Sequence, residues 1–150
     1  MSRTYQWLSV AVAAVGLALC GPASADKSQD FGEYIVHFNA ITTDLLPPEV
    51  AKAYGIQRSK HRALLNVAVI KKVLGTGSRP VRAEIDARAV NLSHQLKRLS
   101  VREVREGNAV YYLAEFGVAD RETLDFTIEI TPEGADRTYP VEFRQQFYTD

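Results

Sequence analysis

The chain has 150 residues, 46% of them hydrophobic, and its 18 Lys and Arg residues balance 18 Asp and Glu residues. This balance excludes a general electrostatic attraction to nucleic acid or to an anionic membrane surface. The single cysteine, Cys20, lies in the N-terminal apolar segment, so the rest of the chain has neither an internal disulfide nor a thiol nucleophile.

The first 25 residues have the order of a cleavable export signal. Arg3 precedes an apolar run over residues 7–19, a Gly-Pro helix breaker follows at 21–22, and Ala-Ser-Ala at 23–25 forms a small-residue cleavage site. The run is shorter than the roughly 20 residues that cross a bilayer, so no membrane span is expected after cleavage. We expect cleavage after Ala25 and a periplasmic location in a bacterium.

Cys20 raises an alternative, because a cysteine that ends an apolar signal can carry the lipid of a bacterial lipoprotein. Small residues normally precede such a cysteine. Here Leu19 precedes it, and this bulky side chain fits the lipoprotein pattern poorly. We therefore expect ordinary cleavage and no lipid at Cys20.

Residues 26–150 are expected to form a single domain. A chain of this size buries about two thirds of its unfolded surface, which is enough for a core without a metal or a disulfide. Without Arg3, 17 Lys and Arg remain against 18 Asp and Glu. No repeat, low-complexity tract or linker divides the segment.

Alternation of apolar and polar residues, the sign of half-buried strands, begins at residues 31–41. There, His37 and Asn39 lie on the polar face. Residues 62–73 are partly apolar on both faces, as in a central strand. Between these two strands, Pro48, Glu49 and Gly55 occupy positions typical of a helix start and end, which predicts one short helix at about 48–54.

The alternation is cleanest at 81–89 and weaker at 95–105. Val104 leaves the face that Leu99 and Val101 share, which predicts a bulge or an early end of the strand. The Glu-Gly-Asn sequence at 106–108 then predicts a hairpin turn.

Three more strands are expected at 109–118, 123–131 and 138–148. Pro140 cannot donate to a strand ladder, so the last strand should lie at a sheet edge or begin there. The inward faces of the strands carry the aromatic residues Tyr34, Phe38, Tyr112, Phe116, Phe126, Phe143 and Phe147, which we expect in the core.

Seven strands and one short helix predict an all-β fold, an antiparallel two-sheet sandwich that is immunoglobulin-like or related. A closed barrel is the alternative. The Gly- and Ser-containing segment 75–80 lacks the Gly-Lys-Ser/Thr ending of a phosphate loop and precedes a strand, so we interpret it as a plain strand connection. No motif indicates a cofactor.

The densest charged feature is the basic segment, residues 58–62, with Arg58, Lys60, His61 and Arg62. These cations could bind a carboxylate or phosphate or meet an acidic partner, and the alternative is a solvated loop that keeps the next strand soluble. Strand alternation would send Arg58, Lys60 and Arg62 to one side if the strand begins that early.

Catalytic and metal-binding patterns are absent from the sequence. His37, His61 and His94 are far apart and have no His-x-His or His-Glu-x-x-His spacing, so no metal site is predicted, although a sandwich could bring them together. No nucleophile elbow is present, and Ser59 beside His61 is weak support for a triad. No catalytic residue is therefore assigned.

Three phrases resemble a family of small exported proteobacterial proteins classed only as a domain of unknown function. They are Gly-Glu-Tyr-x-Val-His-x-Asn-Ala at 32–40, the segment 46–60 that ends in Arg-Ser-Lys, and Phe-Arg-Gln-Gln-Phe-Tyr at 143–148. The resemblance implies a periplasmic β-sandwich and brings no activity, cofactor or catalytic residue.

Two functions follow from the sequence. The first is a non-enzymatic binding or protein-interaction module in the periplasm, with an anionic ligand or a periplasmic protein as its partner. Its candidate residues are those of the basic segment together with His37 and Asn39. The alternative is a hydrolase-like enzyme with a dispersed site or a metal-binding periplasmic protein. Convergence of His37, Asn39, Arg58, Lys60 and His61 in one pocket with a carboxylate would favour the enzyme.

Overall fold

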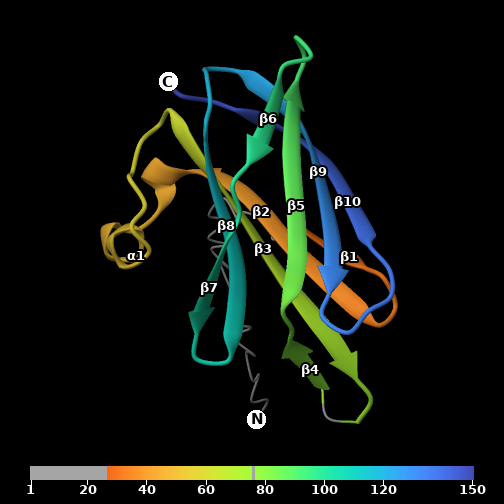
Figure 1. Cartoon of the computed structure of the whole chain (residues 1–150). Helices are drawn as coiled ribbons and strands as arrows, with labels where there is room; N and C mark the ends of the chain where they lie inside the picture. Colours follow the sequence, from red (N-terminus) through yellow and green to blue (C-terminus); the bar gives the residue numbers. More distant parts are fainter. Residues whose placement is uncertain (1–26, 76) are drawn as a thin grey trace, which may run out of the picture.

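The computed structural model describes residues 27–75 and 77–150, so the expected export signal and Cys20 lie outside the described residues. The fold is an all-β sandwich of two antiparallel sheets, as predicted (Figure 1). No helix in the described part of the chain is long and apolar enough to span a membrane.

The six-stranded sheet has the order β1-β2-β3-β8-β7, and β4 pairs with β3 outside this path. These strands are β1 (Lys27–Asp30), β2 (Tyr34–Thr42), β3 (Arg62–Val73), β4 (Gly77–Pro80), β7 (Arg102–Glu106) and β8 (Ala109–Gly117). The four-stranded sheet has the order β10-β9-β5-β6. Its strands are β5 (Ala83–Asn91), β6 (Leu96–Leu99), β9 (Glu122–Pro132) and β10 (Tyr139–Phe147).

The core lies between the two sheets and contains the alternate side chains that the period of two predicted. Phe126 of β9 is 1% exposed and stacks on Phe143 of β10, with ring centroids 4.5 Å apart. The other expected core aromatics are buried as well: Tyr34, Phe38, Tyr112, Phe116 and Phe147. Burial of this apolar surface is the main source of stability in a domain with no disulfide among its described residues.

Three connections cross from one sheet to the other, and they join β4 to β5, β6 to β7 and β8 to β9. None of them involves β1, β2 or β10. On that side of the sandwich the sheets meet through aromatic pairs, among them Tyr34 with Tyr139 at 5.7 Å and Phe38 with Phe143 at 4.8 Å. Here the two sheets are therefore held by side chains and not by the backbone.

The prediction of seven strands was too low, because the described residues contain ten. Strand β1 has the sequence Lys-Ser-Gln-Asp and is exposed on both faces, so it carries no alternation. Strand β4 (Gly-Ser-Arg-Pro) lies inside the segment 75–80, which was interpreted as a plain connection. Glycine and proline are normally depleted in strands, and this short edge strand is held only by pairing with β3.

The expected strand 95–105 is two strands in two different sheets. β6 ends at Leu99 and pairs with β5, whereas β7 begins at Arg102 and pairs with β8. Of the two expectations, a bulge or an early end, the early end is correct, because β6 ends at Leu99. Val104 belongs to β7 and packs on the outer side of the six-stranded sheet. The predicted hairpin turn joins β7 and β8, and Gly107 has a φ of 58° there.

The connection from β2 to β3, residues 43–61, folds over the outer face of the six-stranded sheet. It contains the 3-10 turn η1 (Thr43–Leu45) and the short helix α1 (Pro48–Ala53), close to the expected helix at 48–54. A second small apolar cluster forms where Ala51 and Ile56 contact Leu64 of β3 and Leu113 of β8. Strand β10 lies at a sheet edge, as Pro140 predicted.

Candidate functional site

The basic segment does not act as one surface in the structure. Strand β3 begins at Arg62, so residues 58–61 precede it and strand alternation does not align their side chains. The Arg58 guanidinium turns back to the connection and donates to two carbonyl oxygens, Leu46 O through Nε and Asp44 O through Nη2, each at 2.8 Å. Arg62 lies 3.6 Å from a carboxylate oxygen of Glu115.

The remaining predicted site residues are dispersed over three places. His37 is exposed on the outer face of β2, where it is paired in register with Ser28 and Ala68. His61 lies in a shallow hollow beside Glu115 and Lys97. Only Asn39 and Lys60 share a pocket. The convergence that would favour a dispersed enzyme site is therefore not found for these residues.

Glu122 lies in the same hollow as His61 and is held by several donors. Partial burial alone would raise the pKa of the Glu122 carboxyl. Hydrogen bonds from Lys97 Nζ at 2.7 Å, from Asn91 Nδ2 at 3.2 Å and from the Ala119 N–H at 3.3 Å outweigh that effect and hold the pKa below its ordinary value. A carboxylate held in this way is a structural ion pair and a weak candidate for a general acid.

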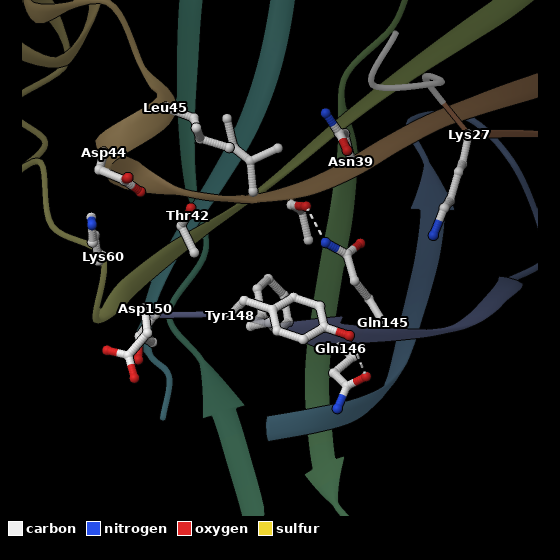
Figure 2. Close-up of a pocket in the computed structure, with 14 residues that line it drawn as sticks. Lys27, Asn39, Thr42, Asp44, Leu45, Lys60, Gln145, Gln146, Tyr148 and Asp150 are labelled. Atoms are coloured by element: carbon white, nitrogen blue, oxygen red, sulfur yellow. Dashed lines mark hydrogen bonds between the residues drawn. The ribbon is translucent and has the colours of Figure 1, made fainter. Parts of the chain in front are cut away.

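The pocket that contains Asn39 and Lys60 is a groove of about 510 Å³ between the end of β2 and the end of β10 (Figure 2). We call it the C-terminal groove. It is lined by Lys27, Asn39, Ala40, Ile41, Thr42, Asp44, Leu45, Lys60, Gln145, Gln146, Phe147, Tyr148, Thr149 and Asp150. Four consecutive residues of β2 contribute, so the groove runs along the edge of that strand.

The polar contacts of the groove come mainly from the glutamines of β10. Gln145 Nε2 donates to the carbonyl oxygen of Ala40 at 2.6 Å, and the Tyr148 hydroxyl donates to Gln146 Oε1 at 2.8 Å. Tyr148 is 62% exposed, so its ring is available to a ligand. Figure 2 shows Lys27 and Lys60 at opposite sides of the groove.

Asp44 adds an acceptor on the Lys60 side of the groove. Its Oδ1 atom is buried and has no hydrogen-bond partner among the described residues. A buried polar atom without a partner is costly, so the described part of the fold leaves this acceptor unsatisfied.

Sequence reasoning missed the contribution of β10 to the groove. A signal was present, because Gln145 stands at an inward position between Phe143 and Phe147, where the alternation calls for an apolar residue. Asp44 and Lys27 carried no comparable signal. Within residues 27–75 and 77–150, no three His, Cys, Asp or Glu side chains form a group that could hold a metal ion.

Comparison with known proteins identifies relatives over almost the whole described chain. Residues 28–150 match the family model described as "Domain of unknown function (DUF4426)". The crystal structure of a DUF4426 family protein from Pseudomonas aeruginosa is 34% identical, covers 83% of this chain and 96% of that chain, and has a TM-score of 0.71. No curated protein matches the chain significantly.

The fold also resembles that of FetP from uropathogenic Escherichia coli. The as-isolated protein, expressed in the periplasm, is 12% identical with a TM-score of 0.57, and covers 82% of this chain and 93% of that chain. A copper-bound variant of FetP is 14% identical with a TM-score of 0.56, and covers 82% of this chain and 95% of that chain. At these identities the likeness concerns the fold alone.

Proposed function

The chain belongs to the DUF4426 family, a domain of unknown function, and on that premise we propose that it is a non-enzymatic binding module of the bacterial periplasm. Its site is the C-terminal groove, and its ligand is an extended segment of another exported protein. The observation that carries the proposal is the edge of β2 where it borders the groove, which no strand of residues 27–75 and 77–150 covers.

Within the described part of the chain, that edge is open because β1 covers only part of β2. Strand β1 pairs with Ile35–Phe38, and no described strand pairs with Asn39–Thr42 on the same side. The Ala40 carbonyl faces the groove, since it accepts from Gln145 Nε2. In an antiparallel strand the N–H and C=O of one residue point to the same side and alternate along the chain, so Ala40 and Thr42 both direct backbone groups at the groove.

An extended peptide can extend a sheet at such an edge. Backbone hydrogen bonds supply affinity in this mode, and contacts to alternate side chains supply specificity. In the groove, a peptide would lie beside β2 and place side chains against Gln145, Tyr148 and Lys60. In the free protein the Gln145 side-chain amide donates a hydrogen bond to Ala40 O. A backbone N–H of the added strand would replace this donor.

The charge of the ligand is inferred from Lys60. Arg58 and Arg62 of the basic segment have partners, whereas Lys60 makes no ion pair or hydrogen bond within the described residues. A carboxylate on the peptide would meet this ammonium group at the rim of the groove. The anionic partner expected from the sequence is thus retained, with Lys60 and Asn39 as its contacts.

The experiment uses the exported protein purified from the periplasm of an expression host and a library of random ten-residue peptides displayed on phage. Peptides selected on the protein are synthesised and then N-methylated at one position at a time. Strand addition predicts that methylation at every second position abolishes binding, because only alternate N–H groups pair with β2. If the positions at which methylation abolishes binding do not alternate along the peptide, strand addition is contradicted.

Point variants then locate the peptide. Lys60→Ala should weaken binding of an acidic peptide several-fold and reduce its salt dependence. Lys52→Ala, which removes an exposed lysine of α1 outside the groove, is the matched control and should leave binding unchanged. Equal effects of the two substitutions, or none, would rule out the C-terminal groove as the site.

The periplasmic location rests on the export signal expected at residues 1–25. The intact mass of the exported protein should correspond to a chain that begins at Asp26. A species that begins at an acylated Cys20 would overturn this and place the protein on a membrane.

A metal-binding role is the second candidate, and it rests on the likeness to FetP, of which one variant is copper-bound. Against it, the described residues contain no group of His, Cys, Asp or Glu suited to a metal ion. Addition of Cu²⁺ to the purified protein should leave its melting temperature unchanged. A rise that EDTA reverses would favour the metal-binding role over the peptide-binding one.

A further inference from the structure

A second pocket, distinct from the C-terminal groove, lies between α1 and the outer face of the six-stranded sheet. It has a volume of about 220 Å³ and is mostly apolar. Leu64 of β3 and Leu113 of β8 form its floor, and Val50, Tyr54 and Ile56 of the 43–61 connection line it from above. We call it the subhelix pocket.

Hydrogen bonds hold the roof of this pocket on both sides of α1. Before the helix, Arg58 donates to the carbonyl oxygens of Asp44 and Leu46. After the helix, Arg102 of β7 donates to the carbonyl oxygen of Tyr54, and the Tyr54 hydroxyl donates to a carboxylate oxygen of Glu106. The position of the roof is therefore held by contacts within the connection and by contacts from β7.

Asn66 is a polar residue in the wall of the pocket, where it stands beside apolar side chains. It stands on β3 between Leu64 and Ala68, the apolar neighbours on the same face of the strand. Its Oδ1 atom is buried and has no hydrogen-bond partner among the described residues. A leucine would fill this position without leaving an unsatisfied acceptor, so the acceptor has a cost that a ligand with a donor would remove.

We propose that the subhelix pocket binds a small, flat, apolar molecule that carries one N–H or O–H donor, and that this donor bonds to Asn66 Oδ1. The volume sets the size of the ligand. An apolar cavity of about 150 Å³ in another protein accommodates benzene, so about 220 Å³ accommodates a fused two-ring molecule. Leu64 and Leu113 contact the ring faces, and Tyr54 and Glu106 lie at the rim.

This site goes beyond the proposed peptide-binding function. The two sites share only the 43–61 connection, and the peptide groove lies at the strand edge whereas the subhelix pocket lies on the sheet face. Failure of one proposal leaves the other intact, because no residue lines both pockets.

The probes are indole and indene, two fused-ring molecules of nearly the same shape, of which only indole has an N–H. Calorimetric titration of the exported protein should show indole binding about tenfold more tightly than indene. In NMR spectra, the methyl signals of Leu64 and Leu113 should shift on addition of indole. Absence of binding by both probes, or equal affinity for both, would overturn the proposal irrespective of any variant.

Two variants at neighbouring positions test the role of the acceptor. Asn66→Leu should abolish the preference for indole, because the acceptor is gone while the apolar wall remains. Asn39→Leu is the matched control, since Asn39 is paired in register with Asn66 but lines the C-terminal groove. Loss of the preference in both variants, or in neither, would contradict the assignment to Asn66.

Discussion

The buried hydroxyl of Thr43 is hydrogen-bonded to the backbone near Ser59, 16 residues further along the chain. The Ser59 N–H donates to Thr43 Oγ1 at 2.8 Å, and Thr43 Oγ1 lies 3.1 Å from Ser59 O and 2.8 Å from Gln57 O. Thr43 is 0% exposed. This one side chain joins the two ends of the connection that contributes to both pockets.

Replacement of Thr43 by valine should therefore destabilise the protein by about 1–3 kcal/mol, because the shape is kept while a buried donor and acceptor lose their partner. Thr43→Ser keeps the hydroxyl and should recover most of the loss. Urea titration followed by circular dichroism measures both. Equal stability of the valine and serine variants would mean that the hydroxyl contributes nothing.

Arg58 and Lys60 should differ in their effect on stability although both belong to the basic segment. Arg58→Ala removes two hydrogen bonds to backbone carbonyls and should cost about 1 kcal/mol, discounted for its exposed position. Lys60→Ala should change the free energy of unfolding by less than about 0.5 kcal/mol. The same urea titration applies, and a larger loss for Lys60 than for Arg58 would contradict the roles given to them.

The lowered pKa of Glu122 predicts acid destabilisation. A carboxyl whose pKa is lower in the folded than in the unfolded chain stabilises the fold above its unfolded pKa, and this contribution is lost as pH falls through the folded value. Glu122→Gln should cost about 1 kcal/mol at pH 7 and much less at pH 2. Melting temperatures from pH 7 down to pH 2 provide the measurement, and a constant difference between the two proteins would show that the charge is unimportant.

The stacked pair Phe126 and Phe143 should respond unequally to truncation. Phe126 is 1% exposed, so Phe126→Ala should cost about 3–5 kcal/mol. Phe143 is only partly buried, and Lys27 Nζ lies 4.9 Å from its ring centroid. Phe143→Ala should cost clearly less, because water can enter part of the space that is vacated. Equal losses in urea titration would show that the exposed side of Phe143 does not moderate the effect.

Much of the sandwich was predictable from the sequence, because one buried face imposes a period of two on a strand. The inward residues of β2 and β9 follow it without interruption. Strands β1 and β4 were not predictable, since their residues are polar, Gly or Pro and only pairing with a neighbour makes them strands. Between β6 and β7 the chain passes from one sheet to the other. In the sequence, the only sign of this was that Val104 interrupts the alternation of apolar and polar residues.

The candidate site was less predictable than the fold. Arg58, Lys60 and Arg62 are close in sequence and were therefore expected on one surface. In the structure, Arg58 donates hydrogen bonds to backbone carbonyls of the connection, and Arg62 forms an ion pair with Glu115. The groove contains residues separated by more than 100 positions, such as Ala40 and Gln145. Alternation along one strand contains no information on which strand lies across from it.

The absence of a chain crossing between β2 and β10 affects what a ligand does there. The aromatic contact between Phe38 and Phe143 joins the two sheets on this side, and the Gln145 contact to Ala40 joins them at the groove. A peptide bound in the groove would contact both sheets on the side where no chain connection joins them. Its binding would therefore raise the free energy of unfolding of the whole domain.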